Sequence, residues 1–122
     1  MPEEVIIGDD KSTDNTVELV RTYIQEYGLD NWKLIENVTN KGWKKNFIEL
    51  MLISDGDIVF LCDQDDLWDK NKIKFMSKAM EKQDIDVLVS YIREFREDGY
   101  VRDWPSKGNG QIHKIKLTKR FM

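Results

Sequence analysis

Residues 4–10 read EVIIGDD, and this short stretch decides the fold. Its apolar run stops abruptly at Asp9 and Asp10, which is typical of a buried strand that ends at the edge of a sheet. Apolar residues then recur at helical spacing over residues 17–27, and residues 32–35 form a second apolar run. A strand, a helix and a second strand in this order predict an α/β fold whose first part is a parallel sheet.

The rest of the chain continues the alternation of helices and strands. The further predicted elements are a helix at 43–54, a strong strand at 57–62, a helix from Asp69, a strand at 87–91, a hairpin over 92–101 and a weak strand at 112–117. The hairpin is signalled by Asp98-Gly99. We expect a single layered α/β/α domain over residues 1–122, with residues 105–122 as a flexible basic tail.

Length and composition exclude several classes of protein. A chain of 122 residues, of which 40% are hydrophobic and 11% aromatic, is too apolar to be disordered and long enough to bury one core. A single cysteine, Cys62, excludes an internal disulfide and a metal site built from cysteines. Because no apolar stretch approaches the roughly 18 residues of a spanning helix and no signal peptide opens the chain, we expect a cytoplasmic protein.

Charge is divided unevenly along the chain. The first 66 residues carry 15 acidic and 6 basic side chains, whereas the remainder carries 8 acidic and 13 basic ones. From Lys107 onward there are five basic residues and no acidic one. Such an end is usually solvated, but it can also contact anionic lipid, so peripheral attachment at the inner face of the membrane is a second expectation. The acidic first half argues against nucleic acid as a partner.

Two acidic clusters follow two of the predicted strands. Asp9 and Asp10 follow the first, and Asp63, Asp65 and Asp66 follow the strong strand signal. Ligands of open α/β sheets bind beyond the carboxyl ends of the strands, so we expect both clusters at one crevice. Five carboxylates there would repel one another, and Mg²⁺ or Mn²⁺ shared with substrate phosphates would offset that repulsion. The Asp-x-Asp spacing places two side chains on one side of an extended segment.

The second cluster also allows other interpretations. A solvated acidic turn that caps the next helix at Asp69 would need no ligand. A helix-loop-helix calcium site would need an oxygen ligand, a glycine and a glutamate where the chain has Leu67, Trp68 and Lys74, so that interpretation fails. A response-regulator receiver domain also has acidic residues after two strands. It typically continues with a Met-Pro pair that is missing here, and this alternative stays open.

Three motifs, in order, resemble those of family-2 inverting glycosyltransferases of the GT-A fold. EVIIGDDKSTDNT at residues 4–16 resembles the family's second-strand signature, and NKGWKKNF at residues 40–47 resembles the Asn-x-Gly…Asn segment that follows it. GDIVFLCDQDDLW at residues 56–68 resembles the metal-binding segment in the form common among rhamnosyltransferase-like members. The resemblance covers residues 4–74 and fades toward the end of the chain.

The resemblance implies transfer of a sugar from a nucleotide-diphosphate donor to the hydroxyl of a saccharide or lipid-linked acceptor. Carried over by position, Asp10, and with less support Asp9, would contact the base or ribose of the donor. Asp63 and Asp65 match the family's Asp-x-Asp and would hold Mg²⁺ or Mn²⁺, with Asp65 as the most direct ligand. Asp63 and Asp66 would also face the donor. The alternative is a non-catalytic nucleotide-binding and metal-binding remnant or assembly module.

Two parts of the family pattern are missing here. Family members begin with a further strand that walls the nucleotide pocket, whereas here the second-strand motif follows Met1-Pro2 directly. Members also carry a catalytic carboxylate well downstream, but Glu97-Asp98 lies at a predicted hairpin turn, so no catalytic base is assigned. We therefore expect an incomplete fold, self-association through an unpaired edge of the strand at 4–8, and no appreciable transfer by the chain alone.

Overall fold

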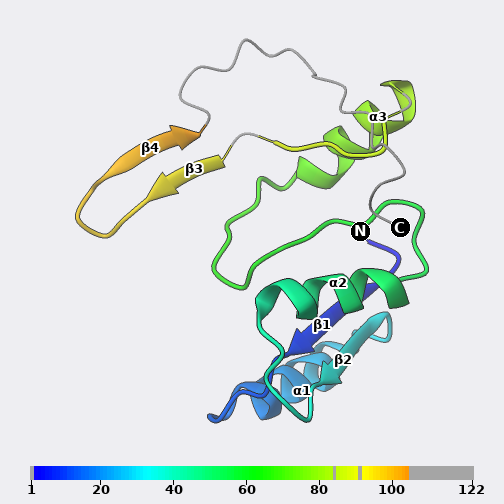
Figure 1. The fold of residues 1–122 in the computed structure, drawn as a ribbon, viewed down its shortest axis with the longest axis vertical. Helices are drawn as coiled ribbons and strands as arrows, with labels where there is room; N and C mark the ends of the chain where they lie inside the picture. The colour runs from blue at the N-terminus through cyan, green and yellow to red at the C-terminus, as the bar shows by residue number, and fades with distance from the viewer. Residues whose placement is uncertain (1, 84, 91, 105–122) are drawn as a thin grey trace. The chain divides into compact units, whose positions relative to one another are not determined.

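The computed structural model describes residues 2–83, 85–90 and 92–104. The elements, in chain order, are β1 (Val5–Asp9), α1 (Thr16–Tyr27), β2 (Trp32–Glu36), α2 (Trp43–Ile53), α3 (Lys72–Gln83), β3 (Ile92–Phe95) and β4 (Val101–Trp104) (Figure 1). The chain divides into two units, residues 1–64 and residues 65–122. The first unit holds β1, α1, β2 and α2, and the second holds α3, β3 and β4.

β1 and β2 form a parallel pair, as the sequence predicts. Their register sets Val5 beside Trp32 and Asp9 beside Glu36. The backbone N–H of Asn37 donates to the carbonyl of Asp9 at 2.9 Å and extends the ladder by one bond. Residues 37–42 then form the β2–α2 loop. The predicted α/β class is confirmed by this strand–helix–strand unit, in which α1 supplies the crossover that parallel strands require.

The alternation of side chains along the strands places α1 and α2 on opposite faces of the pair. Trp32 of β2 contacts Tyr23 of α1, with ring centroids 6.2 Å apart. Val5 of β1 is the register partner of Trp32, so both side chains lie on the face that α1 covers. Gly8 is three residues after Val5 and therefore lies on the opposite face. That face is covered by α2, because a Cβ built on Gly8 would lie 2.5 Å from Leu50 Cδ1. The first unit is therefore layered α/β/α, with the strands between the two helices (Figure 1).

The ends of the helices follow local signals in the sequence. Before α1, the Asp14 carboxylate accepts hydrogen bonds from the backbone N–H and the hydroxyl of Thr16, at 3.0 and 2.6 Å. α1 ends at Gly28 in the left-handed conformation, as predicted. α3 begins at Lys72, and the predicted cap residue Asp69 precedes it: its carboxylate accepts from the backbone N–H of Asn71 at 2.8 Å and forms a turn before the helix.

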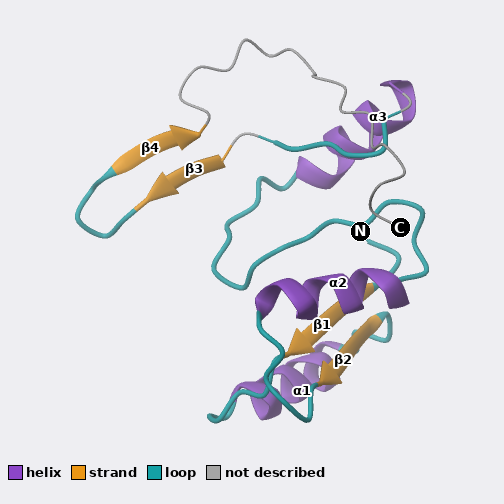
Figure 2. Ribbon diagram, in the orientation of Figure 1, coloured by secondary structure: helices purple, strands orange, loops and turns teal. Residues whose placement is uncertain are grey.

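Two predicted strands are not found in the described residues. Residues 54–71 contain no helix or strand (Figure 2), so the strand predicted at 57–62 is wrong, and residues 85–90 are likewise irregular. Neither segment pairs with a strand of the two sheets that the described residues form, and regular strand structure depends on such pairing. Tyr91, the weak strand predicted at 112–117 and the predicted tail at 105–122 lie outside the described residues.

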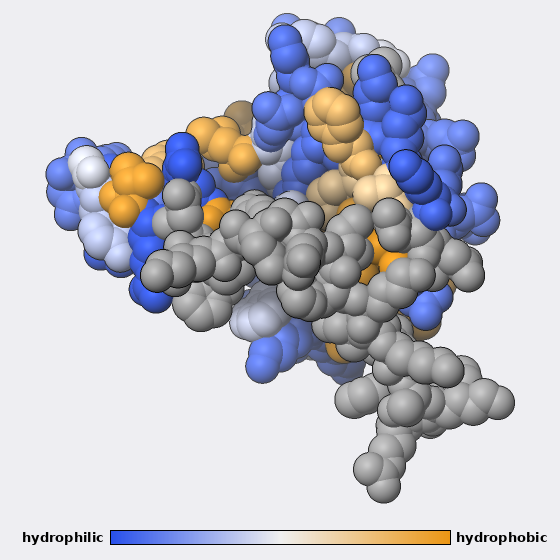
Figure 3. Space-filling view, turned by 90° about the horizontal axis from the view of Figure 1, so that it is seen from above, coloured by the Kyte–Doolittle hydropathy of each residue, from blue (hydrophilic) through white to orange (hydrophobic). Residues whose placement is uncertain are grey.

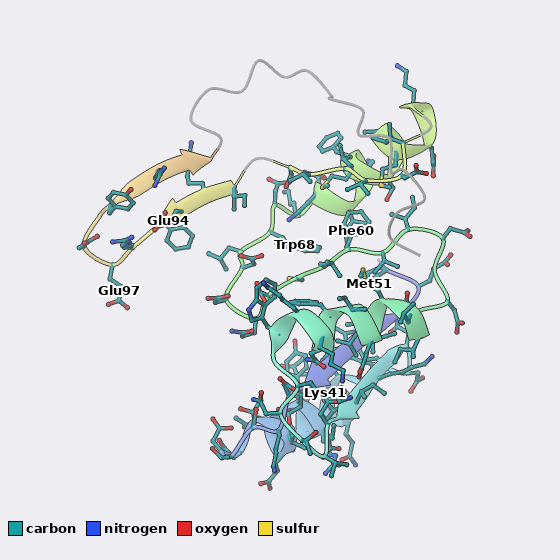
Figure 4. All side chains as sticks on the ribbon, viewed as in Figure 1. Lys41, Met51, Phe60, Trp68, Glu94 and Glu97 are labelled. Carbon is teal, nitrogen blue, oxygen red and sulfur yellow. The ribbon has the colours of Figure 1, made fainter. Side chains whose placement is uncertain are left out.

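β3 and β4 form the predicted antiparallel hairpin in the second unit. Its turn is closed by a bond from the Arg96 N–H to the Tyr100 carbonyl at 3.1 Å. The Asp98 carboxylate accepts from the N–H of Tyr100 at 2.9 Å, and Gly99 takes a positive φ of 86°. Figure 4 labels Glu97 at this turn. The prediction that Glu97-Asp98 serves turn geometry is therefore confirmed for the Asp98 carboxylate.

No apolar side chain is fully buried among the described residues, which differs from the expectation of one core. Two strands with one helix on each face offer too little area to enclose a side chain. Apolar side chains stay exposed on α2, where Leu52 is 78% and Trp43 68% exposed, and on the hairpin, where Val101 is 59% exposed. Figure 3 shows hydrophobic residues at the surface among hydrophilic ones. Each described helix spans 11 or 12 residues, and none has the length and apolarity needed to span a membrane.

Candidate functional site

The carboxylate of Asp10, just past the end of β1, holds the β2–α2 loop. It accepts hydrogen bonds from the backbone N–H groups of Lys41 at 2.8 Å and Gly42 at 2.7 Å, and from Asn37 Nδ2 at 3.0 Å. The carbonyl of Asp10 accepts a further bond from Asn40 Nδ2 at 3.1 Å. Asp10 thus joins the carboxyl end of β1 to the loop that leads into α2.

Gly42 has the backbone geometry that this contact needs. Its φ is 80° and its ψ is 149°, a conformation that residues with a Cβ rarely adopt. A Cβ built on Gly42 would meet no atom within 4 Å, so a larger side chain would fit. Glycine is favoured here because of the backbone conformation. The glycine of the Asn-Lys-Gly motif therefore lets the loop turn its N–H toward Asp10.

The hydrogen bonds to Asp10 keep its carboxyl ionised. They hold its pKa below the ordinary value of 3.8, chiefly through the backbone N–H of Lys41, with further contributions from Asn37 and Gly42. A carboxylate offers about four acceptor positions, and this one uses three of them for its own chain. About one position stays available to a ligand.

We expect the first unit to lose stability as the pH falls through the lowered pKa of Asp10. Because the folded-state pKa is lowered, these bonds contribute fully above the ordinary value of 3.8 and are lost as the carboxyl takes up a proton below it. Thermal unfolding midpoints measured across the acid range should fall less steeply in Asp10→Asn. Glu4 and Asp14, whose pKa values are also lowered, titrate in both proteins. Equal slopes would contradict the prediction.

Asp9 has a different role from its neighbour. It is only 8% exposed, and it is the one buried polar residue among those described. Its Oδ2 accepts a hydrogen bond from the backbone N–H of Ser12 at 3.0 Å, which shapes the turn after β1. The prediction that Asp9 contacts a donor stays a prediction.

An open pocket of about 420 Å³ lies beside Asp10 in the first unit. Its lining is polar and consists of Asp10, Lys11, Ser12, Thr13, Asp14 and Asn40. Lys11 has a positive φ of 67°, which is uncommon for a residue other than glycine and marks a tightly shaped turn. Five of the six lining residues follow β1 directly, and the sixth, Asn40, is brought across from the β2–α2 loop.

The second acidic cluster consists of exposed carboxylates. Asp63 is the second-last residue of the first unit, which ends at Gln64, and Asp65 and Asp66 begin the second. Within the described ranges, no hydrogen bond or ion pair occupies these three carboxylates, and no three acidic, histidine or cysteine side chains gather into a metal-binding group. Mg²⁺ typically takes one or two carboxylates together with substrate phosphates, so the donor chemistry fits. Whether the two clusters share one crevice stays a prediction.

Two asparagines of the site were missed from the sequence. Asn37 Nδ2 donates to Asn46 Oδ1 at 2.9 Å, in addition to its bond with Asp10. Asn46 Nδ2 in turn donates to the carbonyl of Gly8 at 2.9 Å. The sequence carries a signal for Asn46, because it is the final asparagine of the Asn-x-Gly…Asn motif at residues 40–47.

The chain matches the model of the family described as Glycosyl transferase family 2 over residues 1–121. It belongs to glycosyl transferase family 2. Members of this family are transferases, and they often use divalent metals. The α/β class and the parallel pair of the first unit agree with membership.

Relatives extend this finding at low identity. The chain is 33% identical over 100 residues to an uncharacterized protein of Mycobacterium tuberculosis, a match that covers 80% of this chain and 29% of that protein. It is 33% identical over 79 residues to EpsE of Bacillus subtilis, covering 65% and 28%. It is 26% identical over 98 residues to the glycosyltransferase GlyG of Streptococcus pneumoniae, covering 79% and 32%. The chain spans about three tenths of the length of these relatives. No solved structure matches it.

Proposed function

We propose that this chain carries the donor-binding part of a glycosyltransferase that moves a sugar from a nucleotide-diphosphate donor to the hydroxyl of a saccharide or lipid-linked acceptor. Membership of glycosyl transferase family 2 supports the reaction class. The observation that carries the donor site is the polar pocket beside Asp10, with one wall fixed by the carboxylate of Asp10 itself. A pocket preorganised in this way binds a ligand without first ordering its own loop.

In this proposal the first acidic cluster meets the nucleoside. Asp10 has about one acceptor position left after its three bonds to the chain, which suffices for one ribose hydroxyl or one base N–H. Asp9 shapes the turn behind it through Ser12. Asn40 of the β2–α2 loop also lines the pocket and donates to the carbonyl of Asp10. Asp10 would therefore be both a wall of the pocket and a contact of the donor.

The second acidic cluster meets the diphosphate in this proposal. Asp63 and Asp65 would hold Mg²⁺ or Mn²⁺, and Asp66 would lie beside the donor. When bound, such an ion neutralises charge on the donor phosphates and on the departing diphosphate. Support comes from the contrast with Asp10: the carboxylates of this cluster are exposed and unoccupied among the described residues, whereas that of Asp10 is committed to its own loop.

A second candidate is a nucleotide-binding module without transferase activity. It draws support from the engagement of Asp98, the second acidic residue of the Glu97-Asp98 pair, in a hairpin turn. Transfer to a hydroxyl needs a carboxylate that takes the acceptor proton. The proposal assigns that role to no residue of this chain.

We expect the chain to be stabilised by one of the nucleotides UDP, GDP or dTDP, and more strongly in the presence of Mn²⁺. A ligand at 100 times its dissociation constant adds about 2.7 kcal/mol to the free energy of unfolding. Thermal unfolding with each nucleotide, with and without Mn²⁺, measures this gain. Stabilisation that does not depend on Mn²⁺ would favour the module without transferase activity.

A pocket-filling substitution tests whether the nucleotide binds where we propose. Thr13→Trp fills the pocket and should abolish the stabilisation. Thr22→Trp, which places the same side chain on an exposed position of α1, should leave the stabilisation intact. Absence of stabilisation by all three nucleotides, or equal stabilisation of both variants, would contradict the proposal.

A further inference from the structure

We infer that Asn46 of α2 is a positioning residue for the donor pocket: acting through Asn37, it holds Asp10 and the β2–α2 loop in their relative places. Asn46 lines no part of the pocket and is separated from it by Asn37 and Asp10. Because this role concerns nucleotide binding, it rests in part on the proposed function.

A continuous chain of hydrogen bonds links α2 to the pocket. Asn37 Nδ2 carries two hydrogens, and it donates one to Asp10 Oδ1 at 3.0 Å and the other to Asn46 Oδ1 at 2.9 Å. Both donor positions of the Asn37 amide are therefore used. The orientation of this amide, and with it the direction of its bond to Asp10, depends on the oxygen of Asn46.

Asn46 is itself anchored to the strand. Its Nδ2 donates to the carbonyl of Gly8 at 2.9 Å. The carbonyl of Asp9 points toward β2, where it accepts from Asn37, and successive carbonyls of a strand point in opposite directions. The Gly8 carbonyl therefore points away from β2, to the edge of β1 that has no partner strand in the described sheets. Asn46 satisfies this edge carbonyl and orients Asn37 with the same amide group.

The close approach of α2 to β1 makes this bridge rigid. A Cβ on Gly8 would lie 3.0 Å from Asn46 Oδ1 and 2.5 Å from Leu50 Cδ1, so the helix packs directly on the strand backbone. Asn46 is half-buried in this contact. A half-buried amide with satisfied donors and acceptors has one favoured orientation, which suits a residue that positions others.

The test is a double-mutant cycle with two readouts. Asn46→Ala, Asn37→Ala and the double variant are compared with the wild type by hydrogen exchange at the amides of Lys41 and Gly42, without nucleotide. The dissociation constant for UDP, GDP or dTDP, whichever binds, is the second readout. Asn31→Ala is the matched control, because Asn31 Nδ2 donates to the carbonyls of Pro2 and Glu3 beyond the opposite end of β1.

We expect Asn46→Ala to speed exchange at Lys41 and Gly42 about tenfold and to weaken nucleotide binding by a similar factor, since one hydrogen-bond contribution is lost. Asn31→Ala should change neither readout by more than about twofold. The double variant should match Asn37→Ala alone, because both substitutions break one path. Additive effects, or unchanged exchange in Asn46→Ala, would overturn the role.

Two further outcomes keep the result decisive. If Asn46→Ala fails to fold, Asn46→Asp serves instead, because it replaces the donor to the Gly8 carbonyl with an oxygen and should therefore also speed exchange at both amides. Exchange as slow as in the wild type in a folded Asn46→Asp would overturn the role. If no nucleotide binds the wild type, the proposed function fails, and the exchange data still decide whether Asn46 positions the loop.

Discussion

Replacing Asp65 with alanine is expected to lower the rate of sugar transfer about a thousandfold wherever transfer by the unsubstituted protein is measurable. In our proposal Asp65 is the most direct carboxylate ligand of the divalent ion. Charge stabilisation at a transferring diphosphate is worth several kcal/mol, which corresponds to a rate loss of this size. Transfer from a radiolabelled nucleotide-sugar donor at saturating Mn²⁺ measures the effect.

Asp57→Ala is the matched control for this experiment. Asp57 is an exposed carboxylate in the same irregular segment, before the acidic cluster. Its replacement should leave the rate within about threefold of the wild type, since isolated surface charges contribute little. Unchanged activity in Asp65→Ala, or equal losses in both variants, would contradict a metal role for Asp65. Unfolding midpoints of both variants show whether the folded state is retained.

The substitution with the largest expected effect on stability is Gly8→Val. Even a single Cβ at this position would lie 2.5 Å from Leu50 Cδ1 and 3.0 Å from Asn46 Oδ1, and valine adds two more methyl groups. Such overpacking typically costs about 1–3 kcal/mol, and we expect the upper end because the side chains of both Leu50 and Asn46 must give way to three added carbon atoms. Urea unfolding of the chain measures the loss as a lower midpoint.

A second glycine provides the control for Gly8→Val. A Cβ at Gly56 would meet only the Ile58 carbonyl oxygen, at 3.6 Å, which is ordinary contact. Gly56→Val should therefore change the midpoint by less than half as much. Equal midpoints for the two variants would show that α2 does not pack on β1 as described.

Local signals in the sequence were enough for most elements of the first unit. The apolar run before Asp9 and Asp10 predicted β1, and the Gly28 stop marked the end of α1. Asp98-Gly99 predicted the β3–β4 hairpin through the turn that it forms. These signals succeed because each depends on the backbone preferences of a few neighbouring residues.

The segments at 57–62 and 87–90 show where local signals fail. Both are apolar and rich in strand-forming residues, yet neither is a strand in the described structure. Apolar character predicts that a segment seeks burial, but a strand exists only where a neighbour supplies its hydrogen bonds. No property of residues 57–62 alone identifies that neighbour.

The sequence by itself determined the reaction class, because three motifs in family order span residues 4–74 and the chain belongs to glycosyl transferase family 2. Only the tertiary structure decided what the residues of these motifs do to one another. The sequence predicts that Asp10 contacts a ligand. In the structure, three acceptor positions of its carboxylate are used by Asn37, Lys41 and Gly42, which lie 27 to 32 residues later in the chain. Such contacts arise when α2 docks on β1, so they depend on the relative position of two elements and not on any local pattern.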